Sequence, residues 1–200
     1  MDPQATAVVD FWFGPLDGDG RADEAHRRRW FGGGPAFDQE IRERFLGEVE
    51  AALAGQRSDW RRSGRGTLAY ILILDQFTRN LFRGTPRMFA GDPLALAAAE
   101  VAVAGGADRE MPPDLRAFIY MPFMHSEDLA RQHRSVELFT ALLAEAPPAA
   151  REGAQGGLDY AIRHRDIVAR FARFPHRNAM LGRTSTAEEV EFLAGPGSSF

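Results

Sequence analysis

The sequence contains no cysteine and no lysine. Without cysteine the chain has no disulfide, thiol nucleophile, iron–sulfur ligand or cysteine-type zinc site. All 24 basic residues are therefore arginine. The guanidinium fork suits carboxylate or phosphate groups, although GC-rich coding also explains such a bias. The chain lacks HExxH, P-loop and GxSxG motifs, so the enzyme classes that these motifs define are not indicated.

Long apolar runs are also missing. The densest run is LAYILIL, from Leu68 to Leu74, far below the roughly 18 residues of a membrane span. The start MDPQATAVVDF has neither the basic region nor the apolar region of a signal peptide. A net charge of −4 gives no general attraction to nucleic acid or to anionic membranes. We expect a cytoplasmic protein that binds neither nucleic acid nor membranes.

Helix signals recur along the chain, whereas alternating strand patterns are nearly absent. With 200 residues, 44% of them hydrophobic, one domain over residues 1–200 is expected. Asp2-Pro3 and Gly14 predict the ends of a first helix, and Phe37 to Leu53 carries an apolar residue at every fourth position. Further helices are expected at about 67–83, 93–104 and 115–120. Three more are expected: one that begins after a cap at Ser126, one that contains residues 164–171, and one that begins after a capping box at Ser185 and Glu188. Loops with paired prolines and glycines around 147–157 predict a hinge. The fold class is therefore all-α, built from antiparallel helical hairpins.

The helix expected at 67–83 changes character halfway along. Its first half is apolar on all sides, whereas Asp75, Arg79 and Asn80 follow on one face. Such a face predicts a helix that passes from the core to the wall of a cleft. A helix end that emerges into water, with Asp75 and Arg79 as an ordinary four-apart ion pair, remains an alternative.

The stretch HRDIVARFARFPHRN, residues 164–178, joins an apolar helix face to basic side chains. His164 falls on the apolar face and is expected to point inward, and Arg165 lies at the edge of that face. His176 and Arg177 follow Pro175 in a polar turn. His164 is equally well explained as a core histidine that has one satisfied hydrogen bond.

His125 and Glu127 stand immediately before another expected helix. If these segments converge, their side chains line a pocket for an anionic or zwitterionic small molecule, or form an acid–base pair that titrates near neutrality. The proposed binding residues are Asp75, Arg79, Asn80, His125, Glu127, His164, Arg165, His176 and Arg177. A metal site made by His125, Glu127 and His164 is a weaker alternative, because nearby arginines repel cations. We expect no cofactor.

Several long motifs resemble one known family. The segments LDQFTRNLFRGTPRMFAGD, YMPFMHSEDL, HRDIVARFARFPHRNAMLGRTST and PGSSF are similar to signature segments of an uncharacterised bacterial family, domain of unknown function 924. The likeness covers essentially the whole chain. It implies an all-helical, tetratricopeptide-like right-handed array and implies no established activity. Two residues depart from the family pattern: Thr78, where proline or serine is frequent, and Ala172, where glycine is common.

Two classes of function stay open at this point. In the first, the polar residues line a pocket for a small charged metabolite or a peptide end, in an enzyme or a sensor. In the second, the helical array is a protein–protein interaction module whose polar motifs are structural hydrogen-bond networks, as fold analogy suggests. The terminal Phe200 is expected to dock on the protein, since an exposed phenylalanine forfeits roughly 1.5–3 kcal/mol of burial.

Overall fold

The structure is a computed structural model that describes residues 2–198. Phe200, whose docking the sequence predicts, lies outside the described residues. The described part of the chain forms helices and short helical turns and contains no strand. In chain order these elements are α1 (Pro3–Phe13), α2 (Glu24–Gly32), α3 (Gly34–Leu53), η1 (Ser58–Arg62), α4 (Gly64–Ile71), η2 (Leu72–Phe77), α5 (Thr78–Leu81), η3 (Pro86–Phe89), α6 (Asp92–Ala104), α7 (Pro113–Met124), α8 (Leu129–Glu145), η4 (Pro148–Ala150), α9 (Arg151–Phe171), η5 (Pro175–Arg177) and α10 (Ala187–Leu193). The all-α prediction is confirmed.

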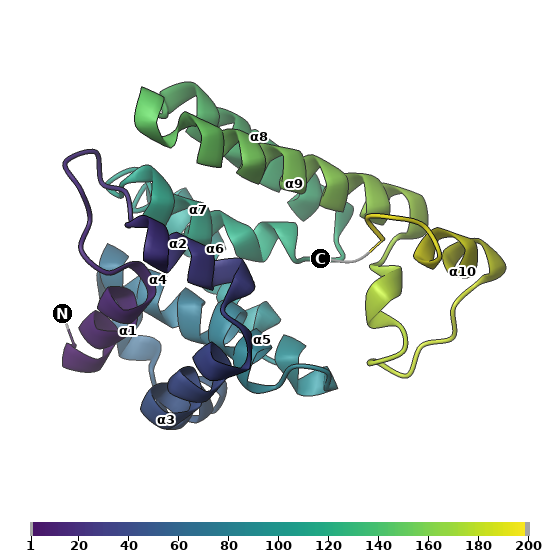
Figure 1. Ribbon diagram of the computed structural model, residues 1–200, viewed down its shortest axis with the longest axis horizontal. Helices are drawn as coiled ribbons and strands as arrows, with labels where there is room; N and C mark the ends of the chain where they lie inside the picture. The colour runs from purple at the N-terminus through teal and green to yellow at the C-terminus, as the bar shows by residue number, and fades with distance from the viewer. Residues whose placement is uncertain (1, 199–200) are drawn as a thin grey trace.

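The helices stack in layers. Figure 1 shows α8 and α9 side by side along one edge of the molecule, with α1 and α3 at the opposite edge. Helix α7 lies between them and packs on α4, α6, α8 and α9. Only the short segment that contains η4 separates α8 from α9, so this pair is a helical hairpin. The right-handed, tetratricopeptide-like order of such hairpins stays a prediction.

Local signals explain the first helices well. The Asp2 carboxylate accepts hydrogen bonds from the N–H groups of Gln4 and Ala5, and Pro3 occupies the first helical position. In α3 the expected stripe Phe37, Ile41, Phe45 and Val49 is buried. The phenylalanine rings of α3 and the aromatic rings of α1 form the aromatic part of the main core. The ring centroids of Phe11 and Phe45, for example, lie 5.0 Å apart.

The helix expected at 67–83 is not a uniform α-helix. It begins at Gly64, continues as a π-helical turn over Leu72–Phe77, and ends as α5. A π turn holds one extra residue and rotates the residues that follow around the helix axis. The turn contains Asp75 and Gln76, which are both buried, among four apolar residues. The predicted cleft wall is therefore more deeply buried than the sequence indicates.

Four expected boundaries are corrected. Helix α7 extends through Pro122, and the cap of α8 is Asp128 instead of Ser126. The predicted hinge at 147–157 is shorter, because α9 already begins at Arg151 and includes the glycines of that stretch. The last capping box is formed by Thr186 and Glu189, one residue later than expected. Proline and capping residues mark helix ends only to within a few positions, because tertiary packing extends a helix past them.

The C-terminal segment has a small core of its own. Ile167, Val168 and Phe174 form a buried cluster against Phe171 and Phe192, apart from the main core. Ala172 ends α9 in the left-handed conformation, with φ of 55°. This residue reverses the chain direction, so that η5 returns toward α6 and α7 (Figure 1).

Among residues 2–198, none of the helices combines the length and the apolar character that crossing a membrane requires.

Candidate functional site

Asp75 and His125 form the centre of a buried polar cluster. The His125 Nδ1 lies 2.6 Å from the Asp75 Oδ1, and Asp75 is 0% exposed. Asp75 belongs to the π turn, and His125 is the residue that caps the C-terminal end of α7. The second Asp75 carboxylate oxygen accepts a hydrogen bond from the Gln76 side chain. Two elements 50 positions apart therefore meet through one charged hydrogen bond.

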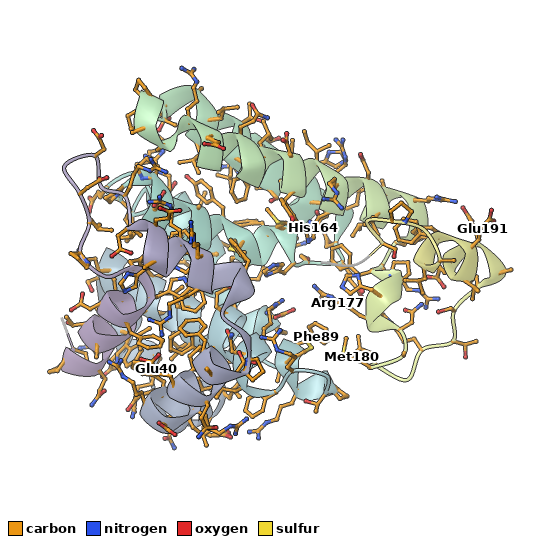
Figure 2. The ribbon with its side chains drawn as sticks, in the orientation of Figure 1. Glu40, Phe89, His164, Arg177, Met180 and Glu191 are labelled. Carbon is orange, nitrogen blue, oxygen red and sulfur yellow. The ribbon has the colours of Figure 1, made fainter. Side chains whose placement is uncertain are left out.

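Two arginines and a second aspartate extend the cluster. Arg79 donates two hydrogen bonds to the Asp92 carboxylate, at 2.9 and 3.1 Å, and its guanidinium nitrogen lies 3.4 Å from the Asp75 Oδ1. Arg177, from η5, donates to Asp92 at 3.4 Å. The Arg177 guanidinium carbon also lies 4.6 Å from the ring centroids of both Phe89 and Phe174. Figure 2 shows Arg177 next to Phe89.

Gly91 allows α6 to come this close to the π turn. A Cβ at this position would lie 2.1 Å from the Leu74 carbonyl oxygen, a distance at which atoms overlap. Any larger residue would push the start of α6 outward and move Asp92 away from Arg79.

Glu127 ties the C-terminal segment to the rest of the site. Its carboxylate accepts two hydrogen bonds from Arg183, at 2.7 and 2.9 Å, and one from the Phe174 backbone N–H at 2.8 Å. Paired donors of this kind fix geometry as well as charge. The segment that carries His176 and Arg177 is therefore fastened at both of its ends.

The histidines complete the cluster. The ring centroids of His125 and His164 lie 6.1 Å apart, and His164 also packs edge-on against Phe174 at 5.4 Å. The His164 Nδ1 bonds to the Tyr160 carbonyl oxygen at 2.8 Å. His176 stacks near Phe174 at 5.6 Å. In Figure 2, His164 projects from α9 toward the interior.

Burial and charge separate the pKa values of these groups. Burial would raise the pKa of Asp75, but Arg79 and His125 outweigh it and hold the pKa below its usual value. Burial lowers the pKa of His125, helped by Arg79 and opposed by Asp75. Burial and the neighbouring cations lower the pKa of His164 to about 3 and that of His176 to about 4. At neutral pH the cluster thus holds ionised carboxylates beside neutral imidazoles.

The comparisons with known proteins agree with this fold. A model of the family "Bacterial protein of unknown function (DUF924)" matches residues 8–197. This chain belongs to the DUF924 family. The DUF924 chain is also similar to a solved structure of the protein of unknown function ATU0120 from Agrobacterium tumefaciens. Identity is 40%, the match covers 94% of this chain and 96% of that one, and the TM-score is 0.80. No curated protein matches.

In this DUF924 protein, seven of the nine predicted site residues contribute to the cluster or fasten it. Asn80 lies apart, since its side chain donates to Asp38 at 2.7 Å, on α3. Arg165 bonds to Asp166, its exposed neighbour, at 2.6 Å. Sequence reasoning missed Asp92 and Arg183. Asp92 looked like an ordinary first-turn residue before Pro93, and Arg183 lies in a loop with no helical pattern.

The cavities described for this DUF924 protein lie elsewhere. One of about 200 Å³ and one of about 420 Å³ are formed around η1 and the start of α4, the larger also by α6. None of the predicted site residues lines either of them. Within residues 2–198, no three histidine or acidic side chains are arranged to hold a metal ion. The water-filled pocket expected at the polar residues stays a prediction, and the structure places these residues in drier surroundings than the sequence suggests.

Proposed function

We propose that this DUF924 protein binds a small charged metabolite or a peptide end at the Asp75–His125 cluster. The observation that carries the proposal is the meeting of charged side chains and an imidazole from four separate segments: Asp75 and Arg79, Asp92, His125, and Arg177. Burying a charge costs several kcal/mol, even for a paired ion. A helical stack gains as much stability from apolar contacts at such positions, so helix packing alone does not require buried charges. Strongly perturbed titratable groups that converge in this way are typical of functional sites.

The cluster also has the groups for proton transfer. Because Asp75 is ionised, the His125 Nδ1 carries the proton of their hydrogen bond. The His125 Nε2 is then an acceptor. A carboxylate that orients an imidazole in this way supports general-base chemistry on a bound ligand. We therefore propose an acid–base role for His125 if the ligand is a substrate.

A thermal-shift screen tests the proposal. The panel contains small anions, cations and zwitterions at matched ionic strength, and compares wild type with His125→Asn and His164→Ala. Arg134→Ala is the control, because Arg134 forms an exposed pair with Glu137 on α8. We expect at least one compound to stabilise wild type and the control but neither cluster variant. Full stabilisation of folded His125→Asn and His164→Ala would refute the site, as would a panel without any binder.

One observation favours the alternative, in which the polar network is structural and the array is an interaction module. The Asp75 carboxylate is fully buried and already has partners in Gln76, Arg79 and His125, so it has little capacity left for a ligand. In that case the cluster variants lose stability without any change in ligand response. The same screen therefore separates the two functions.

We also propose that the helices form a tetratricopeptide-like array in a single cytoplasmic domain. The α8–α9 hairpin and the continuous core from α1 to α9 support the array and the single domain. The cytoplasmic assignment is supported by the short apolar runs of the sequence, the densest of which is far below the length of a membrane span.

A further inference from the structure

Arg177 is a buried guanidinium whose hydrogen bonding is incomplete. The residue is 7% exposed, and its Nε has no acceptor among residues 2–198. Its bond to Asp92 is long, at 3.4 Å, and Arg79 already holds the same carboxylate with two shorter bonds. Burial, together with the charge of Arg79, lowers the pKa of Arg177 to about 10. A buried donor without an acceptor costs about 1–3 kcal/mol, and more when it is charged.

The charges around Arg177 are balanced before any ligand arrives. Arg79 and Arg177 face Asp75 and Asp92, and Glu127 is matched by Arg183. The nearby imidazoles are neutral at pH 7. An added anion would leave the buried cluster with an excess negative charge, which is costly in a medium of low polarity. Uptake of a proton by an imidazole removes that excess.

We infer that the ligand of this site carries an oxyanion group, a carboxylate or a phosphoryl group, that accepts from the free edge of Arg177 while His125 takes up a proton. This inference rests on the proposed function and specifies its ligand class. The planar edge of arginine, with Nε and one terminal nitrogen, fits two oxygens of such a group. The Phe89 and Phe174 rings, each with its centroid 4.6 Å from the guanidinium carbon, restrict the movement of the Arg177 side chain.

His125 is the best proton acceptor in the cluster. The charged and titratable groups that act on His125 come from five elements: Asp75 from η2, Arg79 from α5, Asp92 from α6, His164 from α9, and His176 from η5. Two of them are carboxylates that stabilise an imidazolium, and Asp75 is bonded to it directly. A bound oxyanion adds a third negative charge and so shifts the balance toward the protonated ring.

NMR titration of the five histidines tests the inference. The imidazole signals are followed between pH 5 and 8 in sodium sulfate, in sodium acetate, and in sodium chloride at the same ionic strength. Sulfate stands for the phosphoryl group and keeps its charge throughout, and acetate stands for the carboxylate. We expect the His125 midpoint to rise by about 0.5 unit or more in one of the two salts relative to chloride, as a nearby charge does. The salt that produces the shift identifies the class, and no shift in either salt overturns the inference.

Two variants change the response in opposite directions. Arg177→Gln removes the proposed donor and should abolish the shift, whereas Asp92→Asn removes the competing carboxylate charge and should strengthen oxyanion binding at least threefold. Arg134→Ala, at the exposed pair with Glu137 on α8, should leave the shift unchanged. If Arg177→Gln does not fold, Asp92→Asn decides: unchanged or weaker binding overturns the inference. A screen in which only cations without a carboxylate or phosphoryl group bind, in a His125-dependent manner, would keep the proposed function and overturn this inference alone.

Discussion

Replacing Ala172 by glycine is expected to stabilise the protein. Ala172 ends α9 with φ of 55°, in the left-handed region that suits glycine, and its side chain is exposed. An L-residue pays about 1–2 kcal/mol for this conformation, whereas glycine pays only its larger loss of chain entropy, roughly 0.5–1 kcal/mol. The net gain is about 1 kcal/mol, which corresponds to a rise in Tm of about 2–4 °C for a chain of this size.

The matched control is Ala169→Gly. Ala169 is also exposed and lies three residues earlier, inside α9, where glycine costs about 1 kcal/mol. Urea unfolding of both variants should give changes of opposite sign in the free energy of unfolding. A destabilised Ala172→Gly protein, or two changes of the same sign, would show that the chain reversal after α9 is not strained as argued.

Three further predictions concern the cluster. Gly91→Ala should lower the free energy of unfolding by about 1–3 kcal/mol in urea unfolding, because the added Cβ meets backbone atoms of the π turn. Gly18→Ala is the control and should be near neutral, because a Cβ at Gly18 has no other atom within 4 Å. Asp75→Asn should destabilise the fold by about 3–5 kcal/mol in the same assay, since it leaves buried cations without their counter-charge; a loss below 1 kcal/mol would contradict the pairing. The pKa values of His164 and His176, about 3 and about 4, lie below the unfolded value near 6.5. As the pH falls, the unfolded chain therefore binds protons before the folded one. The free energy of unfolding should be highest above pH 6.5 and fall between pH 6.5 and 4.5. His176→Gln should make this fall with pH less steep, as measured by urea unfolding at each pH.

Much of the fold could be predicted because burial repeats with the helical period. The stripe from Phe37 to Val49 and the cap at Asp2 are local signals, and the structure places both as expected. Boundaries failed where packing overrode a local signal, as at Pro122, a residue type that usually ends or kinks a helix but lies inside α7. The π turn gives no sequence signal, since its residues are ordinary helix formers.

The site was predictable in its residue types and not in its partners. Helical spacing puts Asp75 and Arg79 on one face, and the same reasoning turns His164 inward. Arg79 pairs with Asp75 and also with Asp92, thirteen positions away on α6, and the partner of Glu127 is Arg183, fifty-six positions away. No periodicity relates such pairs, because they depend on how closely helices approach one another.

The π turn explains why this cluster exists at the place where three helices meet. In a regular α-helix, the step of about 100° per residue would place Asp75 on the same face as Leu68 and Leu72. The extra residue of the π turn instead presents Asp75 to the end of α7, where His125 no longer belongs to the apolar part of that helix. Gly91 then lets α6 approach the same turn and bring Asp92 to Arg79. The irregular backbone and the buried charges therefore occur together: Asp75 lies within the π turn, and His125 and Arg79 compensate its buried carboxylate.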